Sequence, residues 1–448
     1  MSPLQNRLGL AILGALTAAG AVGLLSIGSL DLAVPEFVGW YFALFVVYSA
    51  SVWLVLRPGE GKRFSLAVIW LVAIVSRLVL FQADPRLSED LNRYRWQGML
   101  QAAGGNPYLA KPEDLEWEGL RDSTWEHVNR KDFRSVYGPV LELTYHGWYQ
   151  VLSAIGVEES RQPSWFRAPF SLADLGVGWA LMGLLGALGL ARERVLIYLW
   201  NPLVMVEFWV QGHNDSLLLL LLVLALWAAE KGGWKRALAA LAAASLTKFW
   251  PAIAVPYVLR ERGWRRLPWG GVAAGAATAA VLSLPYWGAL GNVAEVLEGF
   301  VGGWRNNDSL YGLIWEWADQ DYERGTELAG RLMFFGLVVV WYSRPSRMAG
   351  LLASIVVVLL LAANVFPWYL TWFVPLLAIY PRPALLLWTA LAVLHYRILP
   401  EYVLLGVWED ADWVRALEYG PVLAWLALDG ARAVWNRWKT TNSDVVSA

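Results

Sequence analysis

The sequence predicts an all-α polytopic membrane protein, and three observations lead to this fold class. Apolar residues make up 57% of the 448 residues and charged residues only 16%, against roughly a quarter in ordinary soluble domains. Apolar runs long enough to cross a bilayer recur along almost the whole chain. The 29 tryptophans suit a protein with many membrane–water interfaces, where amphipathic rings settle. This composition excludes a soluble enzyme, a nucleic-acid-binding protein and a disordered scaffold.

The apolar runs predict helices over 8–29, 37–56, 65–82, 165–190, 195–211, 214–229, 268–288, 326–343, 348–363, 366–380, 384–399 and 416–436. A further apolar segment between Lys235 and Arg260 is broken by Lys248 and Pro251 and has cations at both ends. We expect two short half-helices that meet near Thr247–Lys248 and return the chain to the side it left, because broken helices are tolerated where they line a protein cavity. The count of membrane-spanning helices would then be odd and about 13.

The positive residues of the connections predict the orientation. Lysine and arginine select the cytoplasmic side, and with these spans the cationic connections fall on one side of the membrane. The acidic stretch from Glu401 to Asp412 falls on the other side. We therefore expect a multi-pass protein of the cell (plasma) membrane with cytoplasmic N- and C-termini, provided that 138–156 lies along the outer surface. We expect it to be a monomer.

The predicted organisation has several parts. Two N-terminal helices occupy 1–64, and a central module covers 65–288 and includes a first outer loop over 83–164. A second outer loop spans 289–325. C-terminal helices follow over 326–436, and 437–448 forms a cytoplasmic tail that we expect to be disordered. Long ordered loops are usually functional, so both outer loops are candidate sites.

A short amphipathic helix is predicted at the start of the first outer loop, because apolar residues recur at helical spacing over 91–102. Two interpretations of its acidic first turn remain open. Ser88 caps the helix and the acids favour its positive end, or Asp90 faces a cavity and acts as a general base. In the second interpretation the substrate-binding residues beside Asp90 are Glu89, Arg93, Tyr94 and Gln97.

The stretch Gly212–Asp215 lies at an outer turn between two apolar helices. Asn214 and Asp215 cap the following helix, or His213, Asn214 and Asp215 bind the hydroxyls of a sugar. Lys248 lies at membrane depth, where a lysine is expensive and by default marks a functional site. It forms a structural ion pair or reaches an interface, or it binds a phosphate at the break between the half-helices.

Other cations near the outer side are Arg305 in the second outer loop, and His395 and Arg397 near the end of a late helix. Each alone suits a structural role, but cations that face one outer cavity suggest an anionic lipid headgroup. The four histidines have no metal-ligand spacing, and we expect no metal. Nucleotide and dinucleotide motifs are missing as well, so we expect no cofactor and no nucleic-acid partner.

Several motifs occur in the order of a known family. They are Ser88–Gly98, Asn106–Tyr108, Tyr137–Pro139, Asn201–Leu203 with Glu207–Phe208, Gly212–Asp215, Thr247–Pro251 and Phe366–Trp372. Together they resemble the polyprenol-phosphate-mannose-dependent mannosyltransferases of bacteria, which belong to the GT-C superfamily. The sequence departs from the family's Tyr-Pro-Pro element at Gly138, which replaces the first proline.

The resemblance implies a GT-C-like transmembrane bundle with juxtamembrane helices in the first outer loop. It also implies an inverting transfer of a sugar, mannose by resemblance, from a polyprenyl-phosphate donor to an acceptor hydroxyl at the extracytoplasmic face. The family's catalytic aspartate corresponds to Asp90, and its motif lysine to Lys248. Tyr137 joins the substrate-binding residues. We assign the donor phosphate to Lys248 and, on chemistry alone, to Arg305.

The other partners are membrane lipids and an acceptor, which could be a lipid, a glycan end or a protein. Two alternatives to this transferase use the same features. A transporter or flippase of polyprenyl-linked sugars also needs cations at membrane depth and broken helices. A polymerase or ligase for surface polysaccharide would use a longer lipid-linked glycan.

Overall fold

A computed structural model describes residues 3–57, 64–260, 266–292, 304–343 and 345–446. The described residues form helices and helical turns, with one isolated bridge between Asn306 and Asn364. Five of these helices are long and apolar enough to cross a membrane: Leu4–Leu25, Val34–Leu56, Glu159–Ala187, Trp269–Ala289 and Pro383–Leu405. The predicted all-α membrane class is confirmed, whereas the predicted number of crossings stays a prediction.

The outer surfaces of the helices are strongly apolar. Large apolar side chains are left uncovered on helices all around the bundle, among them Leu4 at 75%, Val46 at 70% and Phe334 at 70% exposure. Water-soluble proteins rarely expose contiguous apolar surface of this extent. These faces are therefore the ones that contact lipid.

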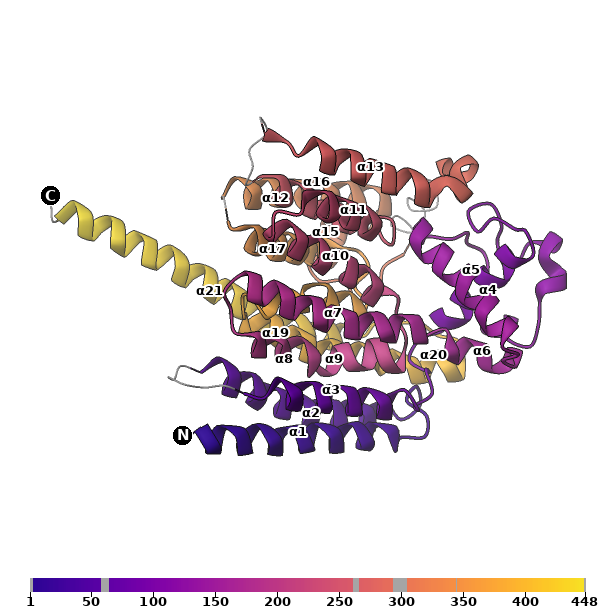
Figure 1. Ribbon diagram of the computed structural model, residues 1–448, viewed down its shortest axis with the longest axis horizontal. Coiled ribbons are helices and arrows are strands. Elements are labelled where there is room, and N and C mark those ends of the chain that lie inside the picture. Colours follow the sequence, from indigo (N-terminus) through magenta and orange to yellow (C-terminus); the bar gives the residue numbers. More distant parts are fainter. Residues whose placement is uncertain (1–2, 58–63, 261–265, 293–303, 344, 447–448) are drawn as a thin grey trace.

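Helices α1 (Pro3–Leu25), α2 (Val34–Leu56) and α3 (Leu66–Leu80) form one side of the bundle (Figure 1). The two helices predicted within 1–64 are confirmed. They are integral to the fold, because two tyrosines of α2 donate hydrogen bonds to distant backbone: Tyr48 to the carbonyl of Ile197 at 2.7 Å and Tyr41 to that of Thr389 at 2.5 Å.

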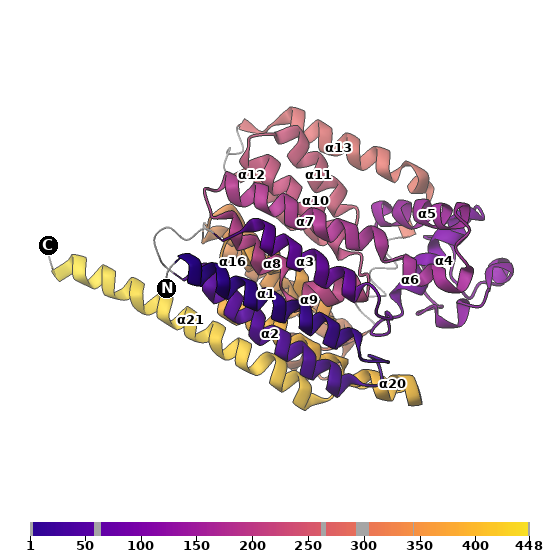
Figure 2. The same cartoon turned by 60° about the horizontal axis from the view of Figure 1, so that its bottom comes forward.

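The first outer loop folds into a cluster of short helices. It contains η1 (Leu115–Leu120), η2 (Trp125–His127), η3 (Glu159–Arg161), α4 (Asp90–Ala102), α5 (Pro139–Ala154) and α6 (Gln162–Trp165). Helices α4, α5 and α6 gather at one end of the bundle, and the two termini lie at the other end (Figures 1 and 2). As predicted, a helix begins at Pro139, since proline is pre-set for the first helical turn. We call the end that carries α4 to α6 the outer end.

The central module runs back and forth between the two ends. Helix α7 (Ala168–Ala187) is followed by η4 (Arg192–Val195), α8 (Leu196–Leu199), α9 (Pro202–Met205), the π-helix η5 (Val206–Val210), α10 (Asp215–Glu230), α11 (Trp234–Ser245), η6 (Trp250–Ile253), α12 (Ala254–Arg260), α13 (Trp269–Ser283) and η8 (Leu284–Ala289).

The predicted break near Thr247–Lys248 is confirmed, because α11 ends at Ser245 and helical structure resumes at Trp250. The chain returns to the side that it left: the Arg260 guanidinium lies 4.7 Å from the ring centre of Trp341, and nearby Arg347 bonds Glu230, where α10 ends.

Three spans predicted as continuous helices are broken. The predicted helix 195–211 divides into short pieces, and so do 366–380 and 384–399, which become η9 (Pro367–Phe373), α18 (Val374–Leu377), α19 (Pro383–Leu391), η10 (Ala392–Ile398) and α20 (Leu399–Leu405). Prolines at 202, 367, 375 and 400 each remove a backbone donor and interrupt the regular ladder. These segments are mostly buried inside protein, where irregular backbone at membrane depth is tolerated.

The remaining helices are α15 (Leu310–Trp317), α16 (Tyr322–Tyr342), α17 (Arg347–Leu361) and α21 (Asp412–Val446). The second outer loop predicted over 289–325 contains α15, and its residues 293–303 lie outside the described residues. Helix α21 continues to Val446, so the disordered tail predicted from residue 437 is wrong for the part that is described. Adding residues to an existing helix needs no new nucleus, which explains this extension.

A buried ion pair holds α3 and α7 together. Arg77 donates to Asp174 at 2.6 Å, and both side chains are fully buried. The carboxylate also accepts bonds from Tyr198 at 2.6 Å and Trp209 at 2.8 Å, while Arg77 donates to the Leu199 carbonyl at 2.6 Å. Four segments therefore share one charged pair, and this gives Arg77 and Asp174 a structural role.

Replacing Asp174 with alanine should lower the free energy of unfolding by about 3–5 kcal/mol, because it leaves the Arg77 charge buried without its carboxylate. Chemical unfolding in detergent micelles measures this change. The matched control is Asp84→Ala, which removes an exposed partner of Arg86 and should change stability by less than about 1 kcal/mol. Equal effects of the two substitutions would contradict the structural role of the buried pair.

Candidate active site

Asp90 begins α4 at the outer end of the bundle, with its side chain 18% exposed. Its Oδ1 accepts a hydrogen bond from the Asn129 amide at 2.8 Å, and its Oδ2 accepts one from the Tyr94 hydroxyl at 3.3 Å. The Ser88 hydroxyl accepts from the backbone N–H of Asp90 at 3.2 Å, so the predicted capping contact and the partly open carboxylate coexist.

The environment of Asp90 favours its charged form. Burial pushes its pKa up, but His213, the Asn129 amide and the charge of Lys248 together outweigh burial and leave the pKa below its ordinary value. The carboxylate is therefore ionised at neutral pH. An ionised, partly exposed carboxylate can accept a proton from a hydroxyl group placed against it.

His213 lies between two carboxylates and is fully buried. Its Nδ1 is 3.6 Å from Oδ2 of Asp90, and its Nε2 is 3.4 Å from Oε2 of Glu207. The imidazole stacks on the Trp368 ring, with 3.8 Å between the centres. Neither ring nitrogen has a hydrogen-bond partner within the described part of the chain. His213 therefore faces Asp90 across a gap wider than a hydrogen bond.

Lys248 and Asp215 form the second charged element of the site. The lysine ammonium donates to both carboxylate oxygens, at 2.9 and 2.8 Å, and the Trp372 indole donates to Oδ1 of Asp215 at 2.7 Å. The ammonium also lies 5.5 Å from the centre of the Tyr369 ring. The predicted ion-pair interpretation of Lys248 is thus confirmed. Because its side chain is still 18% exposed, it also remains accessible to a ligand.

Aromatic rings form a wall beside Asp90. Tyr94 stacks on Tyr145 with 4.7 Å between ring centres, and Tyr137 meets both rings edge-on. The Asn214 amide donates to the Tyr145 hydroxyl at 2.7 Å. The structure therefore brings Tyr94, Tyr137 and Asn214 together at one place, as a common site requires.

Gly138 couples this wall to the break that carries Lys248. Its N–H donates to the Thr247 carbonyl at 2.9 Å, and a Cβ at Gly138 would lie 2.2 Å from the Leu246 carbonyl oxygen. A proline could neither donate this bond nor fit this space. The departure from the family's Tyr-Pro-Pro element therefore has a physical cause in this chain.

The remaining predicted residues of α4 have different surroundings. Glu89 accepts a hydrogen bond from Tyr402 at 3.2 Å, and burial raises its pKa above the ordinary value. Arg93 donates to the backbone carbonyls of Arg130 and Phe133, which holds the segment that supplies Asn129. Gln97 is fully buried. Their assignment to substrate binding stays a prediction.

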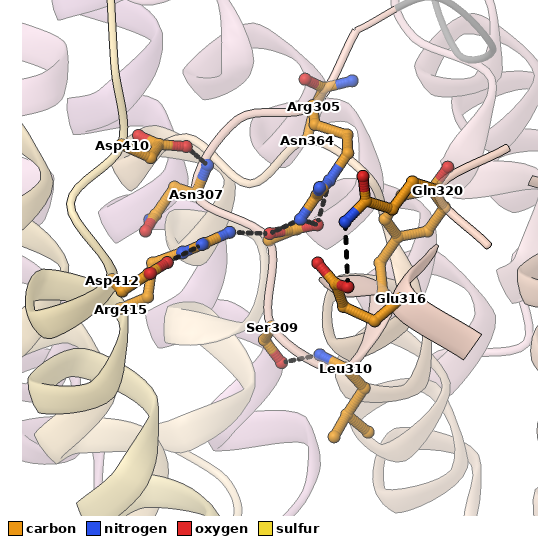
Figure 3. A network of polar contacts seen from close by, with 12 residues as sticks. Arg305, Asn307, Ser309, Leu310, Glu316, Gln320, Asn364, Asp410, Asp412 and Arg415 are labelled. Carbon is orange, nitrogen blue, oxygen red and sulfur yellow. Dashed lines mark hydrogen bonds and ion pairs between the residues drawn. The ribbon is translucent and has the colours of Figure 1, made fainter. Parts of the chain in front are cut away.

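Arg305, His395 and Arg397 belong to another cluster at the outer end. Arg305 pairs with Asp308 at 2.8 Å, and Asp308 also binds Arg415 at 2.6 Å (Figure 3). His395 faces Asp410 at 3.6 Å, and Arg397 pairs with Glu401 at 3.3 Å. Each predicted cation thus has a carboxylate neighbour. The phosphate role of Arg305 stays a prediction.

Comparison with known proteins decides the family. Residues 12–261, more than half of the chain, match the family described as alpha-(1->6)-mannopyranosyltransferase, N-terminal domain. The chain belongs to the alpha-(1->6)-mannopyranosyltransferase family. No curated protein and no solved structure matches the chain.

Membership of this mannopyranosyltransferase family confirms the resemblance to GT-C mannosyltransferases. The chain is a glycosyltransferase and, with its apolar helices, a multi-pass membrane protein. The matched range contains Asp90, His213, Asp215 and Lys248. Arg305, His395 and Arg397 lie beyond it.

Sequence reasoning missed several residues of this mannosyltransferase site. Glu207, Trp368 and Trp372 stood inside motifs that the family resemblance had singled out, but their types alone did not indicate a contact with His213 or Asp215. Asn129 had no signal in the sequence, since it lies in a charged, irregular stretch. Among the described residues, no group of three or more His, Cys, Asp or Glu side chains is placed to bind a metal, so no metal ligands are assigned.

Glu142 of α5 should make the stability of this mannosyltransferase depend on pH. Burial raises the pKa of Glu142 from 4.5 to about 8. Between these values the folded protein keeps a proton that the unfolded chain loses, so the free energy of unfolding falls as the pH rises from about 4.5 to about 8.

Thermal unfolding in detergent at a series of pH values measures this dependence, and Glu142→Gln should flatten it. Glu113→Gln is the control, because Glu113 is 49% exposed in the same outer loop. A slope that persists in Glu142→Gln would show that another group is responsible.

Proposed function

We propose that this mannosyltransferase moves mannose from a polyprenyl-phosphate donor to an acceptor hydroxyl at the extracytoplasmic face, with inversion at the anomeric carbon. The observation that carries the proposal is the ionised, partly exposed Asp90 carboxylate in the same site as the Asp215-bound ammonium of Lys248. A base for the acceptor and a cation for the leaving group are the two charges that such a transfer needs.

The chemistry is a single displacement. Asp90 takes the proton of the acceptor hydroxyl as that oxygen forms a bond to the anomeric carbon. The bond between this carbon and the phosphate oxygen breaks, and the polyprenyl phosphate leaves with the electron pair. Attack from the side opposite the leaving group inverts the configuration of the carbon. Asn129 and Tyr94 hold the carboxylate in place for this step.

Lys248 is the candidate for the phosphate. The bidentate contact with Asp215 keeps its ammonium charged and oriented, and its partial exposure leaves room for a further anionic oxygen. Charge developing on the departing phosphate would be stabilised by a cation that is already in position. The apolar outer faces of the helices allow a lipid-borne donor to approach from the bilayer.

The orientation follows from charge. Arg192, Lys235, Arg260 and Arg347 lie at the end of the bundle away from α4, and positive residues prefer the cytoplasmic side. Both termini lie at this same end (Figure 1). We therefore assign the termini to the cytoplasm and Asp90 to the outside.

Asp90→Asn should reduce the rate of mannose transfer by about two to four orders of magnitude, because it removes the base but keeps the shape of the side chain. The assay uses purified protein, a polyprenyl-phosphate mannose and an α-mannoside acceptor, without nucleotide. Asp84→Asn is the control, since Asp84 is 66% exposed in the same loop. Normal turnover by Asp90→Asn would reject the proposed base. A transporter of the lipid-linked sugar would tolerate this substitution.

Lys248→Ala should weaken donor binding by at least about tenfold, the effect of one charged hydrogen bond. Equilibrium binding of polyprenyl-phosphate mannose measures this loss, and Lys248→Arg, which keeps the charge opposite Asp215, should retain part of the affinity. Lys111→Ala is the matched control, because Lys111 is 38% exposed in the first outer loop. Unchanged donor affinity in a folded Lys248→Ala protein would exclude the phosphate role.

A further inference from the structure

A pocket lies at the outer end between the second outer loop, η10, α20 and the first turn of α21. Its lining includes Asn307, His395, Arg397, Glu401, Asp410 and Trp413. Figure 3 shows Asn307, Asp410 and Arg415, which also lines the pocket, from close by. No role in the proposed displacement uses this pocket.

The inner side of the pocket is built around Asn307. The backbone N–H of Asn307 donates to Asp410 at 2.6 Å, its carbonyl accepts from the Tyr419 hydroxyl at 2.6 Å, and its side-chain amide donates to Glu418 at 3.0 Å. The backbone of Asn307 is in the left-handed region, with φ of 48°. Contacts on three sides hold it there, so the pocket has a fixed floor.

Two buried polar atoms of this pocket lack a partner. Oδ1 of Asn307 and Nε2 of His395 have no hydrogen bond within the described ranges, and the two residues are only 1% and 4% exposed. Buried polar atoms are normally satisfied by protein, water or a ligand. A ligand with hydroxyl groups could satisfy both, since a hydroxyl donates and accepts.

The charges of the pocket disfavour an anionic ligand. Its lining holds two arginines against three acids: Arg397 and Arg415 against Glu401, Glu409 and Asp410. Both arginines already pair with carboxylates, Arg397 with Glu401 and Arg415 with Asp308. Carboxylates accept hydrogen bonds from neutral hydroxyl groups. At the rim, Trp413 is 55% exposed and offers an apolar ring face.

A continuous series of rings joins this pocket to Asp90. His395 contacts Phe366 at 6.1 Å between ring centres, Phe366 stacks on Trp368 at 4.4 Å, and Trp368 stacks on His213, which faces Asp90. A second link runs through α20, where Tyr402, the neighbour of Glu401, donates to Glu89. The pocket thus lies beside the candidate base rather than at a remote part of the molecule.

We infer that this pocket binds the neutral sugar units of an acceptor glycan that follow the unit presented to Asp90. The inference rests on the proposed mannose transfer and adds a specificity to it. An acceptor of several mannose units would fill both the site at Asp90 and the pocket, whereas a single mannoside would reach Asp90 alone. The enzyme would therefore prefer an existing oligosaccharide to a monosaccharide.

The test measures acceptor binding without donor, so that no turnover is needed. Purified wild-type protein, Trp413→Ala and Asp410→Asn are titrated with methyl α-mannoside and with an α-(1→6)-linked mannotriose. We expect both variants to bind the triose about tenfold more weakly, the effect of losing one hydrogen bond or ring contact, with the monosaccharide unaffected. In the transfer assay the KM for the triose should rise by a similar factor with little change in kcat.

Trp317→Ala is the matched control, because Trp317 is 77% exposed and does not line the pocket. Triose binding that is unchanged in folded Trp413→Ala and Asp410→Asn would overturn the inference, and so would an equal loss for the triose and the monosaccharide. Selective loss of triose binding in a protein that transfers no mannose would support the pocket and reject the proposed function, so the two failures are distinguishable.

Discussion

The ion pair between Lys248 and Asp215 is the interaction on which the candidate site depends. Asp215 begins α10, Lys248 follows α11, and the Trp372 indole of η9 completes the contact. A charge at membrane depth needs a partner, so this pair requires three segments far apart in the sequence to meet at one place. The backbone of Gly138 then attaches the first outer loop to the same break. The position of α5 beside α10 follows from these contacts.

Irregular backbone is the second feature that organises the molecule. The half-helix break at Thr247–Lys248, the π-helix at Val206–Val210 and the turns of η9 all lie around the site. In a bilayer, backbone groups outside a regular helix must find partners in protein or in a water-filled cavity. Such segments therefore occur where the bundle encloses polar groups, and here they carry Glu207, Lys248 and Trp368. Loss of helical regularity and gain of a polar site are two aspects of one arrangement.

Part of the site could be predicted from the sequence. Asp90, His213, Asp215 and Lys248 stood out because charged or polar groups at the ends of apolar helices need an explanation, and the structure brings them together. Arg305 and Arg397 stood out for the same reason, but their carboxylate partners Asp308 and Glu401 place them in ion pairs of a different cluster. Residue type and depth alone could not distinguish these two situations, because the partner of a charge is a tertiary fact. Asn129 shows the converse, since it binds Asp90 from an irregular stretch without any pattern.

The sequence by itself determined the solvent of this protein, the order of most of its helices and the position of the break in the 235–260 segment. These features depend on composition, apolar run length and local breakers, which act within a few residues of one another. Only the tertiary structure decided where the late prolines interrupt the predicted spans, which carboxylate each cation pairs with, and which rings lie between Asp90 and the second outer loop. Such contacts join residues up to several hundred positions apart, and no local pattern encodes which distant surface a side chain will meet.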